Sequence, residues 1–414
     1  MREGWEYKKL GNLCKTGAGG TPLKNKKENY ENGTIPWLRS GEVNNRNIVD
    51  CEIKITEIGL NNSSAKLFPP RTVLIAMYGA TAGQVGVLNF ECSTNQAVCG
   101  ILPNNNFIPE FLYYKFLEGK DELIKQAVGG AQPNISQEKI KNTLIPNISL
   151  YEQKQIVAIL DQAFEAIDQA KANIEKNIAN AKELFQSKLN AIFSQKGDGW
   201  EEKSLGEIAD VNYGYTDKST SEGDFRYVRI TDIDNNGELD KTGKVYIKST
   251  PEALNFILKE NDLLMARTGA TFAKVLLYKD YEPSIFASYL IKISFKVNII
   301  NELYWYFTKS GYYWEQANNL SSGSAQPHFN GAALKKVIFS YPLDSSEQQR
   351  LIEIIKGFDN TKKEIISLYL QKLHSLEELK KSILQKAFTG ELTNKEETEP
   401  LQQVAEPTTS YSKN

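Results

Sequence analysis

A tandem repeat is the feature that most constrains how this chain can fold. The segment GWEYKKLG at residues 4–11 returns as GWEEKSLG at residues 199–206, an offset of 195 residues. The word GAT at residues 79–81 returns at residues 269–271, and further matched words keep offsets between 190 and 195 in the same order. Chance identities would scatter in offset, whereas a duplication with small insertions and deletions keeps the offset nearly constant. We therefore expect two similar modules in one chain.

Each copy follows the same internal plan, in which a module of mixed character precedes a long helical segment. Strand-like apolar runs such as residues 73–77 and 262–266 are interrupted by Gly, Asn and Pro. Residues 149–193 then contain no Gly or Pro, and apolar residues recur there at alternating steps of three and four, as they do in residues 345–388. This spacing is typical of a coiled-coil seam. The expected domains are a first module at 1–148, a first helix at 149–195, a second module at 199–344, a second helix at 345–390 and a disordered acidic tail at 391–414.

The two helical segments are expected to pair with each other. A helix of this length spans about 65 Å, more than the diameter of a module of about 145 residues. The alternative is that each helix only covers its own module. The short link at residues 194–199 favours antiparallel pairing, because the second module must then be built at the far end of the first helix. The predicted fold class is α+β, with two similar mixed α/β modules joined by two long antiparallel coiled-coil helices as a pseudo-two-fold tandem repeat.

The composition excludes several classes of protein. The 414 residues hold 49 basic and 51 acidic side chains, so no global positive field marks a nucleic-acid binder. No apolar stretch is long enough to cross a membrane, and the first residues do not resemble a signal peptide. The four cysteines form no CxxC pair, as expected in a reducing compartment. We expect a soluble, cytoplasmic protein.

Catalytic signatures are missing from the sequence. With only His328 and His374, the chain can form neither a Ser–His–Asp triad repeated in both copies nor a zinc cluster. His374 falls on the second helix and is expected to face solvent. A phosphate-binding GxxxxGK[ST] loop and the tetrapeptide signature of amino-methyltransferases are also missing. The sequence predicts a non-catalytic protein without a metal site.

Without catalysis, the function that the sequence indicates is recognition of a partner. Two related modules on a helical rod suit a long, periodic target, and double-stranded DNA is such a target. Residues 1–148 carry 17 basic and 14 acidic groups, whereas residues 199–344 carry 16 and 19. Such a balance predicts weak non-specific affinity, because phosphate neutralisation needs a concentrated basic face. We expect firm DNA binding only together with a more basic partner.

Candidate DNA contacts are polar residues on expected loops. Arg39 and Arg229 end equivalent strand-like segments, and Arg commonly reads guanine through two hydrogen bonds, although each could instead pair with a carboxylate such as Glu42 or Asp232. The GAT loops could let the backbone approach a ligand or could simply turn the chain. Gln and Asn before the last small helix of each module could read adenine or cap that helix. The predicted DNA-binding residues are Arg39, Ser40, Tyr78, Thr81, Gln84, Gln132, Asn134, Tyr215, Arg229, Arg267, Thr268, Thr271, Gln326 and His328.

Taken together, these motifs resemble one family. The repeated GWxxxxLG opening, the GAT turn, the Gln-Pro before a short helix, the Glu-Gln start of each long helix (152–153 and 347–348) and the AFTGEL ending at 387–392 are similar to those of the specificity subunit of type I restriction–modification systems. The resemblance extends over residues 4–392.

The resemblance implies a role in host defence. Such subunits carry two target-recognition domains, each reading one half of a split DNA sequence, and strong divergence between the two modules here predicts an asymmetric bipartite site. The paired helices act as a ruler for the gap and dock two modification (methyltransferase) subunits, with restriction/translocase subunits added. S-adenosylmethionine, ATP and Mg are then expected on the partner subunits, and no cofactor on this chain.

Two alternatives stay open. A specificity subunit of a related two-component restriction system would read DNA in the same way but change the partner. A protein scaffold would use the modules to bind polypeptides and the helices as a spacer.

Overall fold

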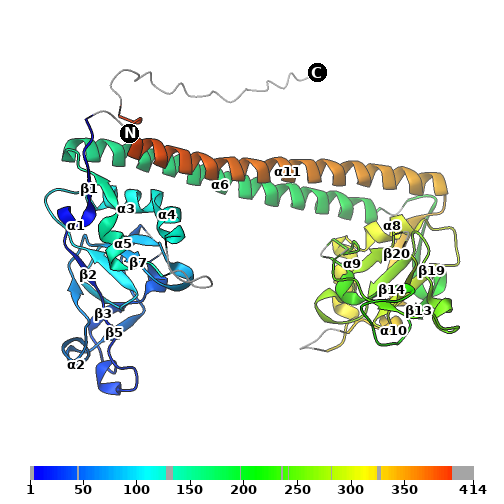
Figure 1. The fold of residues 1–414 in the computed structure, drawn as a ribbon. Coiled ribbons are helices and arrows are strands. Elements are labelled where there is room, and N and C mark those ends of the chain that lie inside the picture. The colour runs from blue at the N-terminus through cyan, green and yellow to red at the C-terminus, as the bar shows by residue number, and fades with distance from the viewer. Residues whose placement is uncertain are drawn as a thin grey trace, which may run out of the picture. The chain divides into compact units, whose positions relative to one another are not determined.

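The computed structural model describes residues 4–43, 46–126, 134–195, 197–234, 236–240, 242–280, 282–323 and 328–393. The chain divides into two compact units. Unit 1 comprises residues 1–172 and 372–414, and unit 2 comprises residues 173–371. Each unit contains one module together with part of both long helices, α6 (Leu150–Phe193) and α11 (Ser345–Thr389) (Figure 1).

Two sheets and a two-stranded ribbon build the module of unit 1. The main sheet has the order β2-β10-β7-β8-β4, the second sheet the order β5-β3-β9-β6, and β1 pairs with β11. Its strands are β1 (Tyr7–Lys9), β2 (Thr16–Ala18), β3 (Ile35–Leu38), β4 (Asn47–Ile48), β5 (Ile53–Ile55), β6 (Leu67–Phe68), β7 (Val73–Ala76), β8 (Val85–Leu88), β9 (Cys92–Thr94), β10 (Val98–Ile101) and β11 (Leu144–Pro146). Its short helices are α1 (Leu10–Leu13), α2 (Glu57–Asn61), α3 (Pro109–Glu118), α4 (Lys120–Lys125) and α5 (Gln137–Asn142), with 3₁₀ turns η1 (Lys27–Asn29), η2 (Ser40–Glu42) and η3 (Gly79–Thr81).

The module of unit 2 has a closely related plan. Its main sheet has the order β13-β19-β16-β17, its second sheet the order β15-β14-β18, and β12 pairs with β20. Its strands are β12 (Trp200–Ser204), β13 (Ala209–Tyr213), β14 (Phe225–Val228), β15 (Tyr246–Ile247), β16 (Leu263–Ala266), β17 (Val275–Leu277), β18 (Ser284–Phe286), β19 (Leu290–Phe295) and β20 (Ile338–Pro342). Its short helices are α7 (Leu205–Ile208), α8 (Asn301–Phe307), α9 (Gly311–Leu320) and α10 (Gly331–Leu334), with 3₁₀ turns η4 (Ile230–Asp232), η5 (Ala253–Phe256) and η6 (Gly269–Thr271).

The duplication predicted from the sequence is visible in strand register. In unit 1, Ala76 of β7 lies opposite Val98 of β10, and Ala18 of β2 lies opposite Cys99. In unit 2, Ala266 of β16 lies opposite Leu290 of β19, and Tyr213 of β13 lies opposite Ile291. The central strands are apolar on both faces because helices or a second sheet cover them, which is why they appear in the sequence as short continuous apolar runs.

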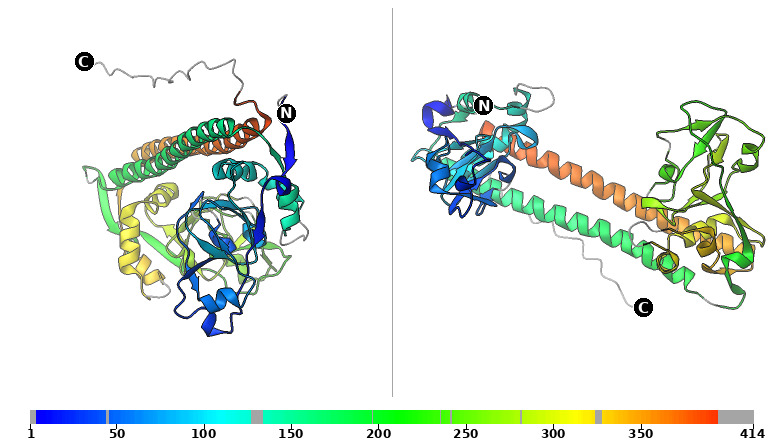
Figure 2. Two further views of the ribbon diagram at one scale, coloured as in Figure 1. Left: turned by 90° about the vertical axis from the view of Figure 1, so that its left-hand side faces the viewer. Right: turned by 90° about the horizontal axis from the view of Figure 1, so that it is seen from below.

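The long helices pair antiparallel in each unit, as predicted, and the α+β fold class is confirmed. In unit 1, Asp168 of α6 forms an ion pair with Lys380 of α11. Lys171, three residues further along α6, pairs with Glu377, which lies three residues before Lys380 on α11. Contacts that advance along one helix while they go back along the other show that the two helices are antiparallel. The helices also lie side by side in both views of Figure 2.

Apolar faces of the helices complete the core of each module. In unit 1, Ile156 and Leu160 of α6 join Leu384 and Phe388 of α11 in the main hydrophobic cluster. In unit 2, Leu189 and Phe193 of α6 join a corresponding cluster with residues of α11 such as Leu351 and Ile355. At about 25 cal/mol per Å² of apolar area, burial of such side chains stabilises each module by about 1.5–3 kcal/mol per residue. The helices are therefore part of each module's core as well as partners of one another.

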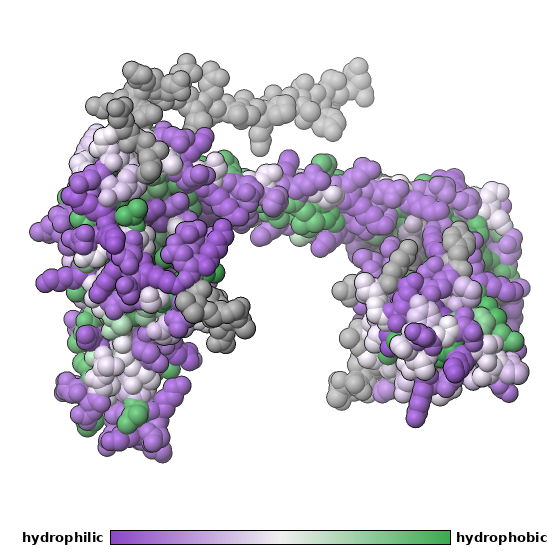
Figure 3. Space-filling model, in the orientation of Figure 1, coloured by the Kyte–Doolittle hydropathy of each residue, from purple (hydrophilic) through white to green (hydrophobic). Residues whose placement is uncertain are grey.

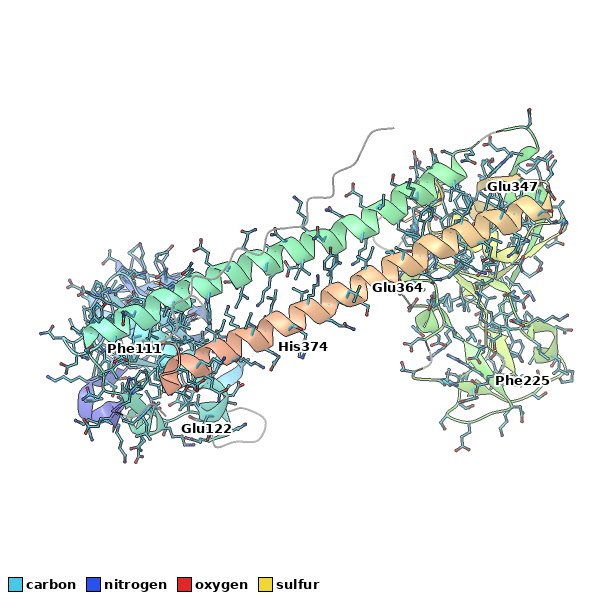
Figure 4. All side chains as sticks on the ribbon, turned by 90° about the horizontal axis from the view of Figure 1, so that it is seen from above. Phe111, Glu122, Phe225, Glu347, Glu364 and His374 are labelled. Atoms are coloured by element: carbon cyan, nitrogen blue, oxygen red, sulfur yellow. The ribbon has the colours of Figure 1, made fainter. Side chains whose placement is uncertain are left out.

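Three expectations from the sequence concern membrane spans, His374 and the tail. No helix within the described residues has the length and apolar character needed to cross a membrane. His374 is exposed on α11, in agreement with the expectation that it faces solvent (Figure 4). Most of the predicted tail, residues 394–414, lies outside the described residues.

Candidate nucleic-acid interface

One edge of each module gathers the loops that carry most of the predicted contacts. In unit 1, β7 ends and β10 begins at the same edge, because the two strands are antiparallel neighbours. The parallel strands β3 and β9 also end there, so Arg39 and Tyr78 both lie next to the connection at residues 95–97. In unit 2, the ends of β14, β16 and β18 meet at the connection 287–289 in the same way. We call these two places the loop edges of modules 1 and 2.

The predicted arginines Arg39 and Arg229 are both tied to acidic side chains. The backbone nitrogen of Arg39 donates to Glu42 at 2.8 Å, and its guanidinium pairs with Glu52. In module 2, Arg229 makes the equivalent backbone contact to Asp232 at 2.9 Å, and its guanidinium reaches the same carboxylate at 3.0 Å. The alternative kept open from the sequence, a pairing with Glu42 or Asp232, is thus present in both copies. Base contact by either arginine remains a prediction.

The two GAT words form equivalent 3₁₀ turns. Gly79 and Gly269 have φ angles of +75° and +78°, which an L side chain rarely adopts, so the glycines are required by the turns. Thr271 donates to the carbonyl of Ile230 at 3.1 Å and so joins η6 to η4. This bond gives Thr271 a structural role in the loop edge.

Most of the remaining predicted residues lie on or next to the loop edges. Tyr78 bridges to Asn134 and Thr268 bridges to His328, which places all four on the loop edges. The backbone of Tyr215 bridges to Ala287 at the loop edge of module 2, while its half-buried side chain packs on Phe256 and shares a hydrogen bond with Thr250. Ser40 and Thr81 belong to the turns η2 and η3, and Gln84 follows η3. Gln132 and Gln326 lie outside the described residues.

A cleft that the sequence reasoning missed opens at the loop edge of module 1. Its volume is about 360 Å³, and Thr21, Lys24, Asn95 and Gln96 line it together with Arg39. The side chains of Thr21 and Gln96 are hydrogen-bonded to each other, and the amide oxygen of Asn95 is buried without a partner in the described structure. Amide and hydroxyl groups of this kind can bond base edges. The sequence feature that could have indicated this cleft is the polar pair Asn95-Gln96 between two apolar runs.

Module 2 carries a different set of side chains at its loop edge. The guanidinium carbon of Arg267 lies 5.4 Å from the ring centre of Tyr213 and 5.9 Å from that of Tyr289. Both rings are exposed. Arg267 was predicted as a contact, whereas Tyr213 and Tyr289 were not, because they are distant from it in sequence. Within the described residues, no group of three His, Cys, Asp or Glu side chains is arranged to hold a metal ion.

Burial shifts the pKa of two side chains in unit 2. Burial raises the pKa of Tyr227, whose hydroxyl group donates to the carbonyl of Tyr215 at 2.7 Å and so joins β14 to the segment around Tyr215. Burial also lowers the pKa of Lys309 to about 8. Lys309 lines a cleft of about 670 Å³ between α6, α11 and module 2, within unit 2.

Comparison with a family model identifies two matched segments in this chain. Residues 2–180 and 197–375 each match the type I restriction modification DNA specificity domain. Each matched segment includes one module and a large part of the long helix that follows it. The duplication inferred from short words is therefore a duplication of this domain.

Individual relatives carry the same description. The chain is 24% identical over 424 residues to the type I restriction enzyme StySPI specificity subunit of Salmonella potsdam, covering 95% of this chain and 90% of that protein. It is 27% identical over 194 residues to the EcoR124I/EcoR124II specificity subunit of Escherichia coli, covering 46% and 48%. It is 29% identical over 229 residues to the MjaIX specificity subunit of Methanocaldococcus jannaschii, covering 51% and 52%. The last two matches span about half the length of those relatives.

Solved structures share the fold. A chain from a structure of a type I R-M system matches with a TM-score of 0.77 at 18% identity, covering 94% of this chain and 99% of that chain. The HsdS subunit from Thermoanaerobacter tengcongensis matches with a TM-score of 0.59 at 18% identity, covering 94% and 98%. These likenesses extend over both modules and both helices.

Proposed function

Because the chain belongs to the family of type I restriction–modification DNA specificity proteins, we propose that it reads a two-block DNA sequence for such a complex. Each module reads one block of double-stranded DNA with its loop edge. The blocks differ in sequence, so the whole site is asymmetric.

The observation that carries this proposal is that the two loop edges share the same backbone structure but carry different side chains. The turn after the central strand holds Met77 in module 1 and Arg267 in module 2, and each residue accepts and donates equivalent backbone hydrogen bonds. The family match supports DNA as the target of both frames. Different side chains on equivalent frames read different base pairs, because base-edge hydrogen bonds carry the sequence information.

The long helices join the two readers and serve the partners. We assign to α6 and α11 a ruler function, which sets the gap between the blocks, and a docking function for two modification subunits. Leu184 on α6 and Leu368, Leu370 and Leu379 on α11 are exposed, and apolar surface of this kind supports docking. Figure 3 shows hydrophobic side chains along the helices between hydrophilic ones.

The chemistry is assigned to the partners. The chain itself acts without catalysis in the cytoplasm, where its DNA target is found. S-adenosylmethionine would be bound by the modification subunits, and ATP with Mg²⁺ by a restriction/translocase subunit. The near-neutral charge of the chain agrees with DNA binding that depends on such partners.

Methylome sequencing tests the proposed function. Cells that express this chain with its modification subunit are compared with cells that express the modification subunit alone. The expected result is a methylated motif of two defined blocks around an undefined gap of constant length, present only with this chain. If purification shows an intact complex but the methylomes are the same, the proposed function is wrong.

A further inference from the structure

Arg267 differs from the other described arginines in its charge partners. Six of them face a carboxylate: Arg39, Arg46, Arg71, Arg226, Arg229 and Arg350. Arg267 has no ion pair and no side-chain hydrogen bond within the described residues, and its Nε, like those of Arg226 and Arg229, is buried without a partner. An unpaired guanidinium retains its capacity to bond a ligand.

Two tyrosines hold this guanidinium in place of a carboxylate. Tyr213 and Tyr289 present their rings to it, with 44% and 55% of their surfaces exposed. The hydroxyl group of Tyr213 accepts a hydrogen bond of 2.9 Å from the backbone nitrogen of Gly331, which fixes this ring against α10. A cation beside aromatic rings is stabilised without consuming its N–H donors. The arrangement therefore orients Arg267 and leaves its terminal nitrogens available.

The same frame in module 1 lacks all three side chains. Met77 donates from its backbone nitrogen to the carbonyl of Ala97 at 2.7 Å, just as Arg267 donates to Tyr289 at 3.0 Å. Ala18 occupies the strand position that Tyr213 occupies in module 2. Met77 and Ala97 are buried. The arginine and both of its supporting rings thus occur together in module 2 and are replaced together in module 1.

We propose that Arg267, oriented by Tyr213 and Tyr289, reads a guanine in the block recognised by module 2. This inference rests on the proposed function and assigns one of its specificity-determining residues. The planar fork of Arg matches the O6 and N7 acceptors of guanine in the major groove, and a bidentate contact of this kind discriminates against the other bases. The side chain of Met77 has no hydrogen-bond donor, so module 1 reads no guanine from the equivalent position.

The test begins from the methylated motif of the wild-type complex. Complexes with R267A and R267K are assayed for methylation of duplexes in which each position of the second block is varied. With wild type, changing one guanine of that block lowers kcat/KM about 5- to 150-fold, and R267A reduces that discrimination to about twofold or less. Replacing the same guanine by 7-deazaguanine, which lacks the N7 acceptor, impairs wild type but not R267A. R267K keeps the charge but loses the planar fork, so it is expected to recover only part of the wild-type discrimination.

A matched control is Lys296→Ala. Lys296 pairs with Asp210 next to the opposite end of β13 and β19, so this variant removes one cation from the same module away from its loop edge. It is expected to retain the wild-type discrimination. Circular dichroism and thermal unfolding verify that each variant is folded, and Y289F serves as a milder second variant that keeps Arg267 and the supporting ring.

The outcomes separate this inference from the proposed function. If a bipartite motif is found but its second block contains no guanine, or if R267A discriminates as wild type does, the assignment of Arg267 is overturned while the proposed function stands. If R267A lowers kcat/KM equally on every duplex varied in the second block, and R267K restores it, Arg267 contacts a phosphate. That result would also overturn the assignment. Failure to find any motif with an intact complex would contradict the proposed function itself.

Discussion

The side-chain oxygen of Gln153 in α6 accepts a hydrogen bond of 2.9 Å from the backbone nitrogen of Ile108, just before α3. The amide nitrogen of Gln153 donates to the carbonyls of Asn106 and Ile148 at 2.8 and 3.0 Å, and the side chain is fully buried. In unit 2, Gln348 of α11 repeats all three contacts, with Ile300, Asn298 and Pro342. Each long helix is thus joined to its own module by one satisfied buried amide.

Loss of this amide is expected to destabilise the unit that contains it. Replacing Gln153 by Leu keeps the approximate volume but leaves a backbone donor and two carbonyls with fewer partners. A cost of about 2–4 kcal/mol follows from the penalty for buried unsatisfied groups. Chemical denaturation measures the change, and Q155L is the matched control because Gln155 is on an exposed face of the same helix. Equal stability of Q153L and Q155L would show that the joint is not energetically important.

The two predicted arginines should differ in their contribution to stability. Asp232 is nearly buried, so Arg229→Ala strands a desolvated carboxylate, at a cost of about 1–3 kcal/mol. Arg39 and Glu52 are both exposed, so Arg39→Ala should cost less than about 1 kcal/mol. Thermal unfolding of both variants tests the order. Methylomes of the same variants test base reading, since an unchanged motif in both would remove these arginines from the list of DNA contacts.

Stability at alkaline pH should depend on Lys309. Burial lowers the pKa of Lys309 to about 8, with Asp359 and Glu238 acting in the opposite direction and Lys362 and Lys363 in the same one. The unfolded state therefore binds the proton more tightly, and this lysine makes the free energy of unfolding rise as pH increases from about 8 toward the ordinary lysine range. The difference between wild type and K309M is expected to change by up to about 3 kcal/mol across that window.

Parallel denaturation series between pH 7 and 10.5 measure this difference. K279M is the control, because Lys279 is exposed and paired with Glu302. A constant difference between wild type and K309M over the whole series would mean that Lys309 titrates normally in the folded protein.

The proposed ruler predicts the gap between the DNA blocks. Deleting residues 171–177 from α6 and 371–377 from α11 removes two turns from each helix while removing the paired residues Lys171 and Glu377 together. Each helix shortens by about 10 Å, which corresponds to about 3 bp of duplex. The methylome of the double deletion should show the same two blocks with a gap shorter by about 3 bp. Deletion from one helix alone should disrupt the pairing and abolish methylation, and an unchanged gap in the double deletion would disprove the ruler.

Local patterns were sufficient for the architecture. The near-constant offset predicted two copies of one module, and the apolar steps of three and four predicted the helices that the structure places at Leu150–Phe193 and Ser345–Thr389. In the sequence the Glu-Gln word is only a shared motif, since the role of its buried glutamine depends on the carbonyls of Asn106 and Asn298, about 50 residues upstream of each glutamine. The two GAT words could approach a ligand or turn the chain; the positive φ angles of Gly79 and Gly269 show that they turn the chain, and ligand contact stays a prediction.

The sequence by itself determined the repeat, the helix periods and hence the pairing, because these depend on spacing along one chain. Only the tertiary structure decided which polar side chains share an edge. Arg39 is held by the distant Glu52, whereas Arg267 is held by Tyr213 and Tyr289, residues far from it in sequence. The physical reason is that strand pairing brings the ends of non-adjacent segments together, so the two rings that hold Arg267 come from strands or connections that no local pattern links to it.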